Sequence, residues 1–103
     1  MFRVNERTYV ILSDEQEPEC YRLAFPNFWK IDSAAEGQLA ALAAWTATAQ
    51  TKVAKVYLEQ SDTWAVVEAF ATREQFAARF DDHFRALTQA VGTFVSIMSH
   101  KNE

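Results

Sequence analysis

The sequence predicts an α+β fold in which two helices pack on an antiparallel sheet of about five strands, in the order β-β-β-α-β-β-α. Three observations predict this fold class. Apolar and polar residues alternate in short segments typical of strands, and these segments are residues 2–5, 8–13, 20–25, 52–60 and 63–71. Ser33 and Thr72 each begin a capping box, which marks the start of a helix. The links between neighbouring strands are short, which favours antiparallel hairpins.

The first three strands are separated by polar segments, and the whole chain of residues 1–103 has the length of a single domain. Residues 5–7 turn the chain after the first strand. Residues 14–19, with the sequence DEQEPE, predict a solvated loop before the third strand. The third strand has an apolar face that consists of Tyr21, Leu23 and Phe25.

A helix is predicted from Ser33 to about Gln50, and it is unusual because it carries no charge between Glu36 and Lys52. Its larger side chains form one stripe, which comprises Leu39, Leu42, Trp45, Thr46 and Ala49. The opposite side is made mainly of small residues, including Ala40, Ala44 and Ala47. A solvated helix face normally carries lysine and glutamate. We therefore expect the face with the small residues to contact a second subunit.

Residues 52–60 and 63–71 predict a hairpin with Ser61 and Asp62 as its loop. This register places Lys55 opposite Glu68 and predicts an ion pair worth up to about 1 kcal/mol. Three further side chains share that face and are candidates for a partner surface, namely Tyr57, Trp64 and Val66. The other face is uniformly small and apolar, and it pairs Leu58 with Ala65, Val56 with Val67 and Ala54 with Ala69.

The last helix is predicted to begin at the Thr72–Gln75 capping box and to face the core along its whole length. Its apolar stripe consists of Phe76, Phe80, Phe84, Leu87, Val91, Phe94, Val95 and Met98.

The segment FPNFW, residues 25–29, allows two interpretations. Either its aromatic side chains fill the core at the entry to the first helix, or Trp29 stays partly exposed as an anchor for a partner. The core interpretation is favoured because buried aromatic residues are common.

The segments at residues 26–29, 53–57 and 64–70, followed by the long amphipathic helix, resemble the YbjN-domain family. The resemblance covers nearly the whole chain. It implies a fold like that of type III secretion chaperones, a role in the regulation of sensory transduction, and no enzymatic activity. The sequence departs from the chaperone-like pattern at its start, where that fold has an additional helix and this sequence has strand-like residues.

Several functional classes do not fit the composition. The formal net charge of -4 without a basic run argues against nucleic-acid binding. Cys20 is the sole cysteine, so no cluster of thiolates is available for a metal. Residues 81–83, DDH, are adjacent on a helix and point about 100° apart, so they cannot converge on one ion. We therefore expect no metal and no cofactor. We expect His83 to be a hydrogen-bonded histidine at the edge of the core. No segment has the length of a membrane span or of a secretory signal, which predicts a cytoplasmic protein.

These patterns predict a non-enzymatic, homodimeric regulator that binds a protein or peptide in the manner of a chaperone. The candidate partner and dimer surface consists of Trp29, Ala40, Ala44, Ala47, Tyr57, Trp64 and Val66. No residue is a candidate for catalysis. The alternative is a small-ligand sensor or a cryptic enzyme with a pocket between the last helix and the sheet, near His83, Trp45 or Tyr57.

Overall fold

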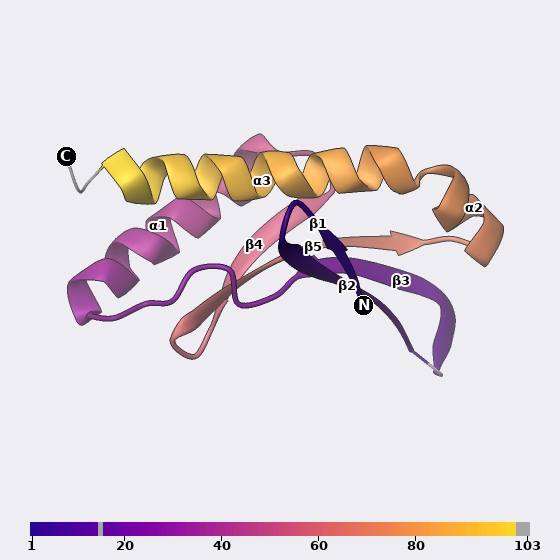
Figure 1. Ribbon diagram of the computed structural model, residues 1–103, viewed down its shortest axis with the longest axis horizontal. Helices are drawn as coiled ribbons and strands as arrows, with labels where there is room; N and C mark the ends of the chain where they lie inside the picture. The colour runs from indigo at the N-terminus through magenta and orange to yellow at the C-terminus, as the bar shows by residue number, and fades with distance from the viewer. Residues whose placement is uncertain (15, 101–103) are drawn as a thin grey trace.

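The computed structural model is an α+β fold in which helices pack on one side of a five-stranded antiparallel sheet (Figure 1). It describes residues 1–14 and 16–100. The elements are β1 (Phe2–Val4), β2 (Arg7–Asp14), β3 (Glu17–Phe25), α1 (Ala34–Gln50), β4 (Ala54–Glu59), β5 (Asp62–Phe70), α2 (Arg73–Ala78) and α3 (Phe80–His100). The spatial order of the strands is β1-β2-β3-β5-β4. The predicted fold class and element order are confirmed.

The strands β2 and β3 continue into the segment predicted as a loop. β2 ends at Asp14 and β3 begins at Glu17, and the ladder shifts its register between Ser13 and Asp14. The loop predicted over residues 14–19 is therefore too long, because Asp14 and residues 17–19 belong to strands; Gln16 lies in a turn, and residue 15 lies outside the described part. In this segment the ladder of β2 and β3 pairs Asp14 with Glu17, and Cys20 of β3 pairs with Phe70 of β5.

The hairpin between β4 and β5 differs in register from the prediction. Gln60 and Ser61 form the turn, and Gln60 takes a left-handed conformation with φ 58°. Lys55 lies opposite Val66, and Tyr57 lies opposite Trp64. The predicted opposite positions are therefore wrong by two residues, although the predicted ion pair between Lys55 and Glu68 is present. Because side chains alternate with a period of two, a shift by two keeps every residue on its predicted face.

The last helical segment is divided into two helices, α2 and α3, which meet at Arg79 (Figure 1). The capping box at Thr72 is present, as predicted. At the break the chain changes direction, so that α2 turns toward the end of the sheet. The ring of Phe76 stacks on Tyr21 at 5.0 Å between centroids, and this contact covers the end of the core. The apolar stripe alone does not reveal such a break.

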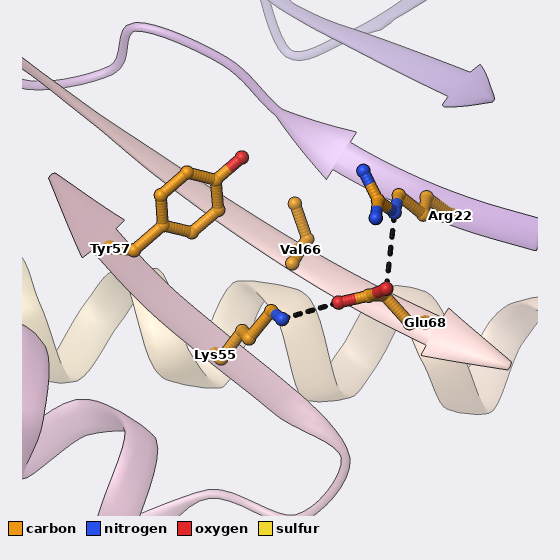
Figure 2. Close-up of a pocket in the computed structure, with 5 residues that line it drawn as sticks. All are labelled: Arg22, Lys55, Tyr57, Val66 and Glu68. Atoms are coloured by element: carbon orange, nitrogen blue, oxygen red, sulfur yellow. Dashed lines mark hydrogen bonds and ion pairs between the residues drawn. The ribbon is translucent and has the colours of Figure 1, made fainter. Parts of the chain in front are cut away.

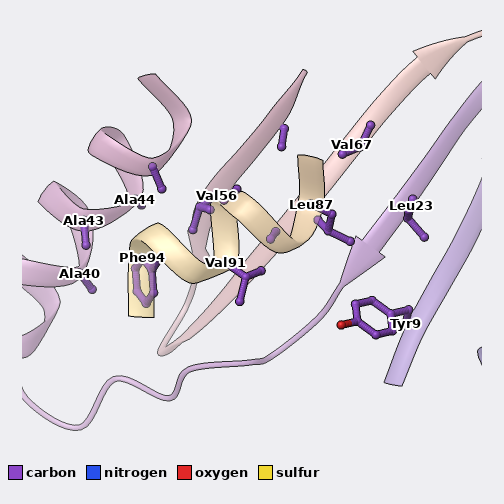
Figure 3. Packing of buried hydrophobic residues seen from close by; sticks show 14 of the residues in the cluster. Tyr9, Leu23, Ala40, Ala43, Ala44, Val56, Val67, Leu87, Val91 and Phe94 are labelled. Atoms are coloured by element: carbon purple, nitrogen blue, oxygen red, sulfur yellow. The ribbon is translucent and has the colours of Figure 1, made fainter. Parts of the chain in front are cut away.

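The core lies between the sheet and the inner sides of α1 and α3 (Figure 3). From α3, the buried residues are Leu87, Ala90, Val91, Phe94 and Met98. The segment at residues 25–29 closes one end of this core. Phe28 stacks on Phe25 at 5.2 Å, and Phe28 and Trp29 both meet Phe94 edge to face, at 5.4 and 6.0 Å. The aromatic side chains of this segment thus lie against the core, with Trp29 half-buried.

The helix α1 has the opposite orientation from the one predicted. Its buried residues are Ala40, Ala43, Ala44 and Ala47, each at most 5% exposed, and they belong to the core (Figure 3). Leu42 and Trp45 are 58% and 70% exposed. The prediction that Ala40, Ala44 and Ala47 form a free partner surface is therefore wrong.

The close approach of α1 to β4 explains this orientation. The hydroxyl of Thr48 accepts a hydrogen bond from the Val56 N–H at 2.9 Å and donates one to the Val56 carbonyl at 3.3 Å. Such contacts require the helix axis to lie near the strand, and alanine side chains permit that approach. They also satisfy backbone groups on the outer edge of β4, which would otherwise attract another strand.

Candidate functional site

The sheet has a second face, directed away from α1 and α3, which we call the open sheet face. Within the described residues no helix lies over it. Its side chains come from alternate positions of β2, β3, β4 and β5, and include Val10, Leu12, Arg22, Lys55, Tyr57, Trp64, Val66, Glu68 and Phe70. Leu12 is 42% and Phe70 is 82% exposed. The face therefore combines charged groups with exposed apolar ones.

Three charged side chains from three neighbouring strands meet at the centre of this face (Figure 2). Glu68 of β5 accepts a hydrogen bond from Arg22 Nε of β3 at 3.1 Å. Its other carboxylate oxygen lies 2.5 Å from Lys55 Nζ of β4. We call these three residues the charge cluster. It contains two positive charges and one negative charge.

The charge cluster keeps Glu68 ionised. The hydrogen bond from Lys55 lowers the pKa of Glu68 below its ordinary value of 4.5. Partial burial opposes this effect, and the positive charges of Lys55 and Arg22 add to it. Glu68 is therefore ionised at neutral pH, where it pairs with both cationic side chains.

A shallow pocket of about 200 Å³ lies beside the charge cluster, lined by Arg22, Lys55, Tyr57, Val66 and Glu68 (Figure 2). Val66 is 3% exposed and contributes an apolar surface. Tyr57 stacks on Trp64 at 6.3 Å between centroids. The indole Nε1 of Trp64 donates a hydrogen bond to Asn27 Oδ1 at 3.0 Å, which fixes the ring. Trp64 thus supports Tyr57 at one side of the pocket.

A second exposed surface lies on α1, opposite its buried alanines. This outer face of α1 consists of Gln38, Ala41, Leu42, Trp45 and Ala49, all exposed. Val53, just beyond the helix, is 67% exposed. No charged residue occurs between Glu36 and Lys52. Exposed leucine and tryptophan on an uncharged helix face are uncommon on a monomer, whose apolar patches are usually small.

The structure separates the predicted partner residues into three places. Tyr57, Trp64 and Val66 do lie together on the open sheet face. Trp29 lies half-buried against Phe94, and the three alanines of α1 lie in the core. Sequence reasoning missed Arg22 as a site residue, because its contact with Glu68 depends on β3 lying beside β5, and these strands are far apart in the sequence.

The alternative pocket was expected between the last helix and the sheet, near His83, Trp45 or Tyr57, and these three residues lie in three different places. His83 projects from α3, with its ring 5.2 Å from that of Phe76, whereas Trp45 is on the outer face of α1 and Tyr57 is on the open sheet face. The Nδ1 atom of His83 is buried and has no hydrogen-bond partner in the described structure. The expectation of a hydrogen-bonded histidine is therefore wrong for this atom.

Comparisons add no further identification. No family model, curated protein or solved structure matches the chain. The resemblance to the YbjN-domain family stays a prediction. Among the described residues, no group of three or more histidine, cysteine, aspartate or glutamate side chains is arranged to hold a metal ion. Across the same residues, no helix combines the length and apolar character needed to cross a membrane.

Proposed function

We propose that the chain is a non-catalytic, homodimeric module that binds a protein or peptide in the cytoplasm. The observation that carries the proposal is the outer face of α1, where Leu42 and Trp45 are 58% and 70% exposed. Leaving these side chains in water forgoes the hydrophobic stabilisation that their burial gives, about 1.5 to 3 kcal/mol for a fully buried large apolar side chain. A partner that covers them regains this energy.

A second copy of the chain suits this surface better than a charged partner does. The face offers no ionic group to complement charges, whereas an apolar face pairs well with itself across a two-fold axis. In an antiparallel pairing of two α1 helices, an axis between Leu42 and Trp45 would place Trp45 of one subunit on Leu42 of its partner. This arrangement also aligns the helix dipoles favourably.

The size of the contact indicates a reversible dimer. A helix of 17 residues is about 25 Å long and about 10 Å wide. A contact centred on two such helices is smaller than a standard interface of roughly 800 Å² per subunit. We therefore expect dissociation in the micromolar range.

Dimerisation through α1 would leave the open sheet face free, because this face lies on the other side of the sheet from the helices. Its exposed Leu12 and Phe70, together with the charge cluster, give it the mixed character of surfaces that bind other proteins. The resemblance to chaperone-like regulators supports the same class of function.

Sedimentation velocity tests the dimer. At tens of micromolar the wild-type chain should sediment with about twice its 11.8 kDa mass. Trp45→Glu should sediment as a monomer, because two carboxylates would face each other across an apolar contact. Gln89→Glu is the matched control, since it adds the same charge at an exposed position of α3. A wild-type monomer, or a Trp45→Glu variant that remains dimeric, contradicts the proposal.

A further inference from the structure

The charge cluster is more than a bridge between strands, because its cations keep donors that Glu68 does not use. An arginine has five N–H donors and a lysine has three. The contacts with Glu68 use the Nε–H donor of Arg22 and one N–H donor of the Lys55 ammonium group. Figure 2 shows the end of the Arg22 guanidinium group turned toward Val66 and Tyr57, on the pocket side.

We propose that the charge cluster is a carboxylate-binding site that holds an acidic side chain of a bound peptide segment. The inference rests on the proposed function, because peptide recognition presupposes a binding module. It adds the position of the contact and the chemistry of the partner.

The local charge favours an anion even though the chain as a whole is acidic. The cluster has one positive charge in excess, whereas the whole chain has a formal net charge of -4. A single carboxylate would neutralise that excess. Glu68 acts as a positioning residue, since it holds the two cations side by side before the ligand arrives. Hydrogen bonds between charged partners are shorter and stronger than neutral ones, which gives the contact selectivity.

The size of the pocket indicates a side chain rather than a free small molecule. Its volume of about 200 Å³ lies below the roughly 300 to 1,000 Å³ typical of small-molecule sites. Val66 lines one side of the pocket, and the Arg22 and Lys55 side chains are each 53% exposed, so both cations are accessible to a ligand from solvent.

The surroundings indicate apolar residues next to the acidic one. Leu12 lies directly opposite Arg22 in the ladder of β2 and β3, and Phe70 lies two residues beyond Glu68 on the same face of β5. Both are exposed, at 42% and 82%. An extended peptide segment with an acidic side chain between two apolar ones would place its carboxylate on the charge cluster. Its apolar side chains would then cover Leu12 and Phe70.

A pair of blocked pentapeptides tests the inference by titration into isotope-labelled protein, followed by NMR. One has a central glutamate between leucine and phenylalanine, and the other has glutamine in its place. The glutamate peptide should bind about tenfold more tightly, as expected for hydrogen bonds to a charged group. It should shift the amide signals of Tyr57 and Val66, which line the pocket.

Three variants assign the effect to the cluster. Arg22→Gln and Lys55→Gln should each reduce the preference for the glutamate peptide severalfold, and both positions are exposed, so the fold should tolerate the change. Lys30→Gln removes the same charge at an exposed position outside the cluster and should keep the preference.

Equal binding of the two peptides, or an unchanged preference in both cluster variants, would overturn the inference. Acetate that binds as tightly as the glutamate peptide would overturn the assignment to a peptide side chain. These failures differ from a failure of the proposed dimer. If the preference is absent while Trp45→Glu still dissociates the dimer, only the carboxylate site is wrong. If the preference is present in a chain that is monomeric throughout, only the dimer is wrong.

Discussion

Ala44 and Trp45 are neighbours in the sequence, but Ala44 is buried and Trp45 is exposed, and glutamate at each position should have opposite consequences. Ala44 is 5% exposed and lies in the core. Glu at this position would place an unpaired carboxylate among apolar side chains, at a cost of about 3 to 5 kcal/mol. A domain of this size has a total stability of about 5 to 15 kcal/mol. Ala44→Glu should therefore lower the melting temperature by roughly 15 to 30 °C or prevent folding.

Trp45→Glu should change the stability of the monomer little. The side chain is 70% exposed, so its replacement removes few contacts within the chain. Surface substitutions of this kind usually change the free energy of unfolding by less than about 0.5 kcal/mol. Association should be lost, because two carboxylates would face each other across an apolar contact.

The two variants should be compared by thermal and urea unfolding, both followed by far-ultraviolet circular dichroism, because this signal reports the secondary structure and not one tryptophan. The protein concentration should be low enough that the wild type is monomeric, since association stabilises the folded state. Sedimentation velocity at high concentration gives the second readout. An Ala44→Glu variant as stable as the wild type, beside a Trp45→Glu variant that unfolds, would show that the orientation of α1 is the reverse of the one described.

Two further predictions concern contacts that join the strands and helices. The pKa of Glu68 is lower in the folded chain than in the unfolded chain. The stability that ionised Glu68 contributes is therefore complete above its ordinary pKa of 4.5. This stability is lost as the pH falls through the lower pKa of the folded chain. Between about pH 5 and about pH 3 the wild type should therefore lose up to about 1 kcal/mol more than Glu68→Gln in urea titrations, and equal losses would contradict the role of the cluster. Thr48→Val removes the hydroxyl that binds both backbone groups of Val56. It should destabilise the chain by about 1 to 2 kcal/mol in thermal melts. It should also increase light scattering from aggregates, because the backbone groups at the edge of β4 lose their partner. A variant as stable as the wild type would show that the hydroxyl contributes nothing.

The features that depend on local sequence could be predicted. The helix starts at Ser33 and Thr72, the order of the elements and the apolar stripe of α3 all follow from residues close together in the chain. The capping box is complete only at Thr72, because the Glu36 carboxylate accepts from the Asp32 N–H and not from the Ser33 N–H. The faces of the β4–β5 hairpin were predicted correctly even though its register was not, because the wrong register differs by an even number of residues. Local patterns thus predicted which side of this hairpin faces the helices.

The charge cluster could be predicted only in part. Lys55 and Glu68 belong to one hairpin, so their placement on a common face follows from the sequence. Arg22 joins them because β3 pairs with β5, with Arg22 opposite Glu68. This pairing brings together residues 46 positions apart, and no local pattern encodes it. The break at Arg79 was missed for a similar reason, since Phe76 turns toward Tyr21 on a strand far away in the sequence.

The orientation of α1 was predicted wrongly because the larger apolar residues were taken to mark the buried side. That assumption fails when the surface opposite the helix is close and already lined by small side chains. Ala54, Val56 and Ala65 present such a surface, and each is at most 5% exposed. Leucine and tryptophan at the inner positions of α1 would overfill this space and displace the helix from β4, with the loss of the Thr48 contacts. The small residues therefore pack inward, and Leu42 and Trp45 remain exposed on the outer face of α1.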